Sequence, residues 1–158
     1  MRLAISGHRG LSAATERLID EGIRAELARL DAAELVGVTC LADGADHIFA
    51  RAVLDAGGRV EVIVPAAKYR DGLPVESHAT YDELLAQASA VHEQPHVEST
   101  EQAHMDASAH MLKRADGLLA VWDGKPARGY GGTADVVQLA RESGVGVTVI
   151  WPDGATRD

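Results

Sequence analysis

The chain has 158 residues and 46% of them are apolar, which is enough for one domain with a buried core and argues against a disordered protein. Acidic residues outnumber Lys and Arg by 24 to 15, and the net charge of −9 disfavours nucleic acid as a partner, because its binding proteins usually present a basic face. No apolar run reaches the roughly 20 residues of a membrane span, and the N-terminus lacks the apolar segment of a signal peptide. The single cysteine, Cys40, cannot form an internal disulfide, so we expect a cytoplasmic protein without a membrane segment.

Apolar runs that are typical of strands alternate with stretches of helical periodicity along the chain. The first strand is predicted at residues 2–6, and a helix capped by Ser12 follows it, with an apolar stripe that runs from Leu18 to Leu30. A strand at 35–41 leads into a helix that ends at Gly57, a typical residue to follow a helix. Further strands are predicted at 60–65, 117–122 and 145–152, with a short one considered at 90–94, and further helices at 79–89, 100–114 and 133–142.

The predicted strands are continuous β-branched and apolar runs, which is typical of a parallel sheet that is covered on both faces. The sequence therefore predicts a single Rossmann-like, doubly wound α/β domain over residues 1–158, with a mainly parallel sheet and helices on both faces. In such sheets ligands bind in the crevice outside the carboxyl ends of the strands. Four loops are expected there: "SGHRG", "ADGAD", "PAAKYR" and "DGKPARGYGGT".

The last of these loops carries glycines directly before a predicted helix. Gly131, Gly132 and Thr133 stand at the expected helix N-terminus, where free N–H groups and the helix dipole favour an anion. A phosphate-binding loop and a simple sharp turn are both consistent with this pattern. The sequence has neither a G-x-x-x-x-G-K-[ST] loop nor a G-x-G-x-x-G fingerprint in the first turn, so ordinary dinucleotide dehydrogenase chemistry is not indicated.

Three segments together resemble the SLOG superfamily: "SGHRG", "LADGADHIFARAVLDAGGRVEVIVP" and "RADGLLAVWDGKPARGYGGTADVVQLA". This superfamily includes the LOG-type phosphoribohydrolases, the DNA-processing protein DprA and small sensor-like proteins of the YpsA kind. The resemblance covers nearly the whole chain. It implies a Rossmann-like fold in which the first loop and the glycine-rich loop bind a nucleotide or a nucleotide-like phosphate. It also implies a homo-oligomer paired through helices, for which we expect a dimer. The predicted helix 100–114 offers apolar Ala103, Ala107, Met111 and Leu112 for this contact.

Two catalytic groups of LOG enzymes are not matched in this chain. Their motif P-G-G-x-G-T-x-x-E ends in a glutamate, but Val136 stands at that position and Tyr130 replaces the second glycine. Their arginine, about nine residues before the position of Asp116, has no counterpart in the segment "DASAHM". The resemblance therefore supports binding more than it supports hydrolysis.

Several polar residues near the strand ends have both a binding and a structural interpretation. His8 and Arg9 would present cations to a ligand, although an ion pair to a nearby carboxylate explains Arg9 equally well. Asp46 fits a helix-dipole partner first and a ribose ligand second, Asp123 fits a turn or a functional acid, and Lys68 fits a phosphate contact or an ordinary loop lysine. The predicted ligand-binding set is Ser6, Gly7, His8, Arg9, Gly44, Asp46, Lys68, Gly129, Gly131, Gly132 and Thr133.

The letters "HEQPH", residues 92–96, match the H-E-x-x-H pattern of zinc proteases, which depends on a helix that places both histidines on one face. Pro95 removes an N–H and disfavours helical geometry at Gln94, so the sequence favours a solvated connection here. His104 and His110 are six residues apart and would lie on different sides of a helix. No metal site is therefore predicted.

Three functions are consistent with these patterns. The first is sensor-like binding of a nucleotide or nucleotide-derived phosphate, with weak or no catalysis and no separate cofactor. The second is an enzyme acting on the N-glycosidic bond of nucleotides, a phosphoribohydrolase or a nucleoside deoxyribosyltransferase, with Asp123, Asp135 or Asp46 as the carboxylate. The third is a DprA-like nucleic-acid-binding module, which the net charge opposes.

Overall fold

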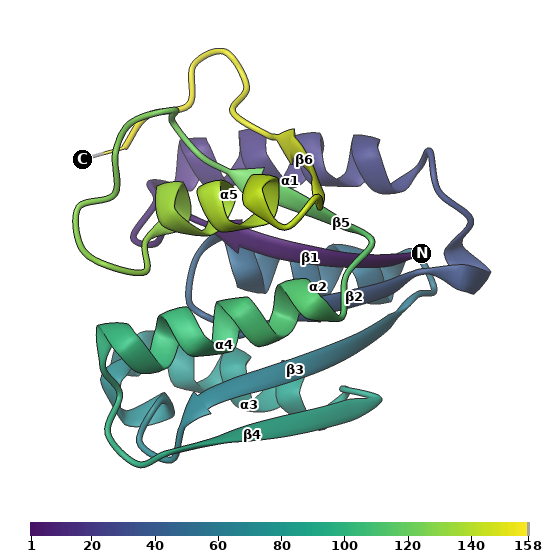
Figure 1. Cartoon of the computed structure of the whole chain (residues 1–158). Coiled ribbons are helices and arrows are strands. Elements are labelled where there is room, and N and C mark those ends of the chain that lie inside the picture. The colour runs from purple at the N-terminus through teal and green to yellow at the C-terminus, as the bar shows by residue number, and fades with distance from the viewer. Residues whose placement is uncertain (158) are drawn as a thin grey trace.

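The computed structural model describes residues 1–157, which form a six-stranded parallel sheet with helices against both faces (Figure 1). The strands lie in the order β4-β3-β2-β1-β5-β6, and every neighbouring pair is parallel. The strands are β1 (Arg2–Gly7), β2 (Val36–Thr39), β3 (Arg59–Ala66), β4 (Ala90–His96), β5 (Gly117–Val121) and β6 (Gly146–Val149), and the helices are α1 (Ala13–Leu27), α2 (Ala45–Asp55), α3 (His78–Ala86), α4 (Glu101–Lys113) and α5 (Thr133–Glu142).

This architecture confirms the predicted α/β class, the parallel sheet and the Rossmann-like winding. The predicted helix caps are also present, since the Ser12 side chain accepts the N–H of Thr15 and Gly57 takes a left-handed φ of 90° after α2. Two short 3-10 helices, Arg70–Gly72 and Val75–Ser77, lie between β3 and α3. None of the helices in residues 1–157 is long and apolar enough to cross a membrane.

The strand order reverses beside β1. The chain builds outward from β1 through β2, β3 and β4, and then returns through α4 to place β5 and β6 on the other side of β1. Such a reversal opens a crevice at the carboxyl ends of the two strands that flank it. The crevice is therefore expected above the ends of β1 and β5.

Alternate residues of the central strands enter two hydrophobic layers on opposite faces of the sheet. Leu3 and Ile5 of β1 pack with the buried sides of α1 and α2, whereas Ala4 packs with α4 and α5. Phe49 and Met111 are among the largest side chains that are fully buried in these layers. Because both faces are covered, the strands have the continuous apolar composition seen in the sequence.

The apolar side of α4 belongs to this core. Ala103, Ala107, Met111 and Leu112, which the sequence offers as a surface for a second copy, are all buried within the single chain. They are therefore not available for pairing, and that assignment is wrong because the chain's own sheet and helices already cover them. The dimer itself stays a prediction that rests on the resemblance.

The "HEQPH" segment belongs to a strand, which confirms the short strand considered at 90–94 and extends it to His96; the interpretation as a solvated connection is wrong. The segment forms the end of β4, the edge strand beside β3, and its polar side chains meet α4. Gln94 bonds His110 at 2.7 Å and His96 bonds Asp106 at 2.8 Å. Pro95 is tolerated because an edge strand has one side that needs no N–H donor. In the part of the chain that the structure describes, no group of three His, Cys, Asp or Glu side chains could hold a metal ion.

An ion cluster joins three elements at the opposite end of the sheet from the crevice. Glu61 of β3 accepts hydrogen bonds from Arg2 of β1 at 2.6 and 3.0 Å and from Arg114, directly after α4, at 3.2 Å. The Glu61 side chain is only 13% exposed. The hydrogen bond from Arg2 is the main reason that the pKa of Glu61 falls to about 2, with Arg114 acting in the same direction.

Replacing Glu61 with Gln should lower the free energy of unfolding near neutral pH by about 2 kcal/mol, because two partly buried arginines lose their carboxylate. The depressed pKa means that wild type has the full stabilisation above the carboxyl's usual pKa and loses it as the pH falls toward about 2. Urea unfolding at about pH 7 and about pH 3 should therefore show a gap between the two proteins that narrows in acid.

A Glu83→Gln protein provides the control, because Glu83 forms an exposed ion pair with Arg51. Exposed pairs contribute little to stability. An equal loss in both variants would contradict the special contribution of the Glu61 cluster.

Candidate functional site

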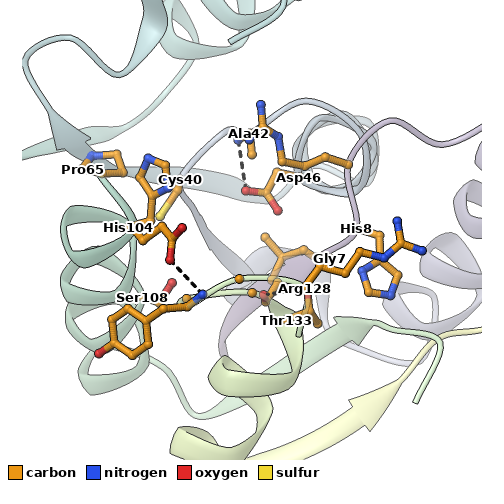
Figure 2. Close-up of a pocket in the computed structure, with 18 of the residues that line it drawn as sticks. Gly7, His8, Cys40, Ala42, Asp46, Pro65, His104, Ser108, Arg128 and Thr133 are labelled. Atoms are coloured by element: carbon orange, nitrogen blue, oxygen red, sulfur yellow. Dashed lines mark hydrogen bonds between the residues drawn. The ribbon is translucent and has the colours of Figure 1, made fainter. Parts of the chain in front are cut away.

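A cavity of about 370 Å³ opens above the carboxyl ends of β1 and β5, where the strand order reverses (Figure 2). Its walls come from the segments that follow β1, β2 and β3, from α4 and from the glycine-rich loop before α5. This volume is in the range of small-molecule sites. Segments that are distant in the sequence thus converge at the predicted edge of the sheet.

The glycine-rich loop turns sharply before α5. Gly131 has a φ of 88°, a left-handed value that favours glycine, whereas Gly132 has a φ of −68°, which any residue can adopt. A Cβ on Gly132 would lie 2.9 Å from the Cβ of Ala127, so this glycine is required by packing inside the loop. Helix α5 begins at Thr133, and within residues 1–157 the N–H groups of Thr133 and Ala134 have no hydrogen-bond acceptor.

Two carboxylates already bind N–H groups of this loop. Glu101, at the start of α4, accepts the N–H of Tyr130 at 2.9 Å, and Asp135 accepts the N–H of Gly131 at 2.9 Å. These contacts identify a stretch of backbone whose N–H groups converge on negative oxygens, as in anion-binding loops. The donors at the start of α5 remain available for another anion.

Three arginines line the cavity: Arg9, Arg128 and Arg157. Arg9 is engaged in an ion pair with Asp43 at 2.7 Å, and Arg157 lies 3.8 Å from Asp123. Arg128 precedes the glycine-rich loop and, among the described residues, has no ion-pair partner. It is therefore the arginine that can approach an anion without first breaking an ion pair.

His8 lines the cavity as a neutral ring and not as the expected cation. It is 4% exposed, and the N–H of Asp123 donates to its Nε2 at 3.0 Å, so this nitrogen carries no proton. Burial lowers the pKa of His8, and the nearby Arg157 lowers it further. These effects outweigh the Asp123 carboxylate, which lies 3.2 Å from the same nitrogen and favours protonation. His8 therefore connects the first loop to the end of β5.

Asp46 is a buried acid beside the cavity. It is 6% exposed, its Oδ2 accepts the N–H of Ala42 at 3.1 Å, and its carboxyl group points toward the cavity in Figure 2. Burial raises the pKa of Asp46 to about 7, although the Ala42 N–H and the Thr39 hydroxyl act in the opposite direction. The charge of Arg9 also acts in this opposite direction, but its Nε donates to Asp43, and burial outweighs these effects.

The part of the cavity near α4 is lined mainly by neutral side chains, beside the Glu101 carboxylate at the start of that helix. Cys40, Pro65, His104 and Ser108 lie together on this side in Figure 2, and the ring of Tyr69 packs edge-on against His104 at 5.6 Å. Burial lowers the pKa of His104 and raises the pKa of both Cys40 and Tyr69, so all three are neutral near pH 7. The cavity thus has N–H donors and Arg128 on the side of α5, and neutral, partly aromatic side chains beside Glu101 on the side of α4.

The structure brings most of the predicted ligand-binding residues to one cavity. Gly44 instead lines a neighbouring cavity, and Lys68 lines neither and pairs with Glu98 at 2.8 Å. The two acids first considered for catalysis, Asp123 and Asp135, are not in the lining, and each accepts a backbone N–H of its own loop. The predicted residues that line the cavity are Ser6, Gly7, His8, Arg9, Asp46, Gly129, Gly131, Gly132 and Thr133.

Sequence reasoning missed Arg128, Arg157 and Glu101. Arg128 directly precedes the glycine-rich loop, so its position in the sequence could have identified it as a cation beside the predicted anion site. Arg157 and Glu101 reach the cavity only because the C-terminal segment and the start of α4 fold onto it. The LOG-type arginine is unmatched in the sequence, yet guanidinium groups reach the cavity from Arg128 and Arg157.

No family model matches this chain, and no curated protein matches it significantly. Solved structures do match. DprA from Streptococcus pneumoniae aligns over 94% of this chain and 49% of its own, with 19% identity and a TM-score of 0.67. DprA from Helicobacter pylori, described for its single-stranded DNA binding mode, aligns over 99% of this chain and 68% of its own, with 18% identity and a TM-score of 0.70.

A Moco carrier protein from Chlamydomonas reinhardtii aligns over 94% of this chain and 75% of its own, with 17% identity and a TM-score of 0.58. These likenesses confirm the Rossmann-like fold that the resemblance implies. This chain spans about half the length of the pneumococcal DprA. At such identities the likeness shows the fold, and function has to be argued from the site.

The cavity depends on a close approach at Gly7, which a substitution can test. A Cβ there would overlap the Cβ of Ala45 and lie 2.8 Å from the Cβ of Val121. Gly7→Ala should therefore force α2 away from the ends of β1 and β5 and lower the free energy of unfolding by about 1–3 kcal/mol. Gly146→Ala is the matched control, because no atom lies within 4 Å of its Cβ position. Urea unfolding that shows equal costs for both variants would refute this packing argument.

Proposed function

We propose that this protein binds a nucleotide or a nucleotide-derived phosphate in the cavity, in a sensor-like role with weak or no catalysis. The observation that carries the proposal is the start of α5. There the N–H groups of Thr133 and Ala134 have no acceptor in residues 1–157, Thr133 lines the cavity, and Arg128 stands nearby without an ion pair. A helix N-terminus with unpaired N–H groups attracts anions, because the helix dipole adds a partial positive charge.

The carboxylates around the loop limit the charge that the ligand should carry. Glu101 and Asp135 occupy the N–H groups of Tyr130 and Gly131, and Asp46 lies on the same cavity. Like charges at short range repel strongly where water is scarce. A ligand with one phosphate therefore fits this site better than a triphosphate.

The neutral side chains on the α4 side of the cavity support a ring beyond the phosphate. His104 and Tyr69 provide aromatic surface, and the Ser108 hydroxyl provides a polar contact. Aromatic side chains pack well against a planar ring such as a nucleobase. Together the two sides of the cavity favour a nucleoside monophosphate or a molecule of similar design.

One observation keeps the N-glycosidic-bond enzyme as a second candidate. Asp46 is a carboxyl group on the cavity, and that chemistry needs a carboxylate beside the sugar. Asp123 and Asp135 are poorer candidates, since both lie outside the lining. Incubation with AMP followed by chromatography for free adenine distinguishes binding from hydrolysis.

Nucleic acid binding and pairing of two copies are weaker proposals. The Helicobacter pylori DprA is described as binding single-stranded DNA, but this chain has a net charge of −9. A homodimer rests on the resemblance alone. Neither is needed for the cavity to bind a small anion.

Thr133→Ala should weaken the binding of a nucleoside monophosphate by about 1.5–3 kcal/mol, because a hydrogen bond to a charged group is lost. This corresponds to roughly a 10- to 150-fold rise in Kd. A thermal-shift screen of AMP, ADP, ATP, cyclic nucleotides and NAD precedes the measurement, since a ligand that binds the folded state raises the Tm. Calorimetry with AMP then compares the variants.

Two further variants sharpen this comparison. Thr133→Ser restores the hydroxyl and should restore most of the affinity, and Thr148→Ala removes an exposed threonine of β6 as a control. If no nucleotide raises the Tm, or if Thr133→Ala binds as tightly as wild type, the glycine-rich loop is only a turn.

Arg128→Gln should raise the Kd for AMP by roughly 10- to 100-fold and reduce its dependence on salt, because a guanidinium–phosphate contact is lost. Arg29→Gln is the control, because it makes the same change in net charge far along the chain from the glycine-rich loop. The Arg29 side chain is 76% exposed and lies between α1 and β2. It should leave AMP binding close to wild type. Equal effects of the two substitutions would mean that Arg128 acts only through the overall charge.

A further inference from the structure

Asp46 is a cavity carboxyl that forms no ion pair within residues 1–157. Glu61, at the far end of the sheet, is held between Arg2 and Arg114, whereas the cation nearest to Asp46, Arg9, pairs with Asp43. Asp46 is nevertheless 6% exposed and forms part of the cavity wall. A buried carboxyl without a cation favours its neutral form.

The position of Asp46 matters as much as its burial. In Figure 2 its carboxyl group points into the space between the Cys40–His104 side and the Gly7–Thr133 side. A ligand that places a phosphate at the start of α5 and a ring near His104 would put its middle against this carboxyl. In a nucleotide the middle is a sugar, which offers hydroxyl and ether oxygens as hydrogen-bond acceptors.

We propose that Asp46 is a specificity-determining residue that binds the ligand as a neutral acid. Its carboxyl O–H donates a hydrogen bond to an oxygen in the middle of a phosphorylated ligand. The proposal rests on the proposed function, because it requires a phosphate in the same cavity. A phosphate dianion close by penalises an ionised carboxyl, so the ligand and the proton on Asp46 favour each other. Free protein that has lost this proton must recover one from solvent before it binds.

Among the cavity's groups with a shifted pKa, Asp46 is the group whose pKa lies near 7. Its surroundings contain Arg9 and Asp43 from the neighbouring loops, and the same cavity contains Glu101, Arg128 and Arg157 as further charged groups. Burial lowers the pKa of His8, His47 and His104 and raises that of Cys40 and Tyr69. These neutral side chains do not change charge just above pH 7, whereas burial raises the pKa of Asp46 to about 7.

The sign of the pH effect follows from this linkage. Binding takes up a proton, so the affinity for a phosphorylated ligand falls as the pH rises above the pKa of Asp46 in the free protein. The second phosphate pKa of about 6 lies below this range, so the ligand's own charge is constant there. Between about pH 7 and about pH 9 the neutral fraction of Asp46 falls from near one half to near one hundredth, which raises the apparent Kd by roughly 10- to 50-fold.

Calorimetry with AMP at about pH 7 and about pH 9 tests the proposal on wild type and on Asp46→Asn. The amide of asparagine can still accept the Ala42 N–H and can donate to the ligand, but it does not ionise. We expect the variant to lose the pH dependence and to bind AMP more tightly than wild type at the higher pH. Glu101→Gln is the matched control, because it removes another carboxylate of the cavity and should keep the pH dependence.

A second measurement follows the proton directly. Carbon-13 NMR of the Asp46 carboxyl should give a midpoint near pH 7 without ligand, and saturating AMP should move it upward. AMP binding with the same Kd at both pH values, or with an unchanged slope in Asp46→Asn, would overturn this inference and leave the proposed function standing. Failure of wild type to bind AMP at either pH would overturn both.

Discussion

The site depends on one steric constraint, which is the absence of a side chain at Gly7. A Cβ there would overlap Ala45 at the start of α2 and crowd Val121 at the end of β5. Because Gly7 has only a hydrogen there, β1, β5 and α2 pack closely together. The N–H of Ala45 donates to the carbonyl oxygen of His8 at 3.4 Å. Asp46 follows Ala45 directly, so the same close packing brings its carboxyl to the cavity wall and removes it from water. The missing side chain at Gly7 thus determines both where the cavity lies and why the Asp46 carboxyl favours its neutral form.

Net charge says little about what this cavity attracts. The chain carries −9, yet the groups that would touch an anion are the N–H donors of Thr133 and Ala134 and the guanidinium of Arg128. Charges on the far surface are separated from the cavity by more than the screening length of salt water, about 8–10 Å, and contribute little there. Glu101 and Asp135 already occupy two N–H groups of the glycine-rich loop. Under the proposed function, selectivity would be set by these few groups in and beside the cavity and not by the net charge.

The sequence predicts the fold well because local periodicity and buried β-branched runs determine where strands and helices form. It also predicts which loops converge, since parallel strands place their carboxyl ends at one edge. It fails where long-range contacts decide the outcome. Arg157 reaches the cavity only through the folded C-terminal segment, and Gly132 is required by Ala127 packing and not by its backbone angles. The burial that neutralises His8 and the Asp43 contact that diverts Arg9 are likewise tertiary effects.

Two acids, Glu61 of strand β3 and Asp46 of helix α2, illustrate how tertiary partners set the state of a carboxyl group. Glu61 has two arginines within hydrogen-bonding distance, and their attraction exceeds the cost of partial burial, so its pKa falls to about 2. Asp46 is more deeply buried, accepts one backbone N–H at 3.1 Å and forms no ion pair within residues 1–157; desolvation therefore outweighs the charge of Arg9, and its pKa rises to about 7. An ionised, fully paired acid is suited to hold strands together, because its charge is constant over the pH range in which the protein works. An acid that is half-protonated near neutral pH is suited to a site, because a small change in its surroundings changes its charge. The first kind of acid, Glu61, lies in β3 at the end of the sheet away from the cavity, and the second, Asp46, lies at the start of α2 on the cavity wall.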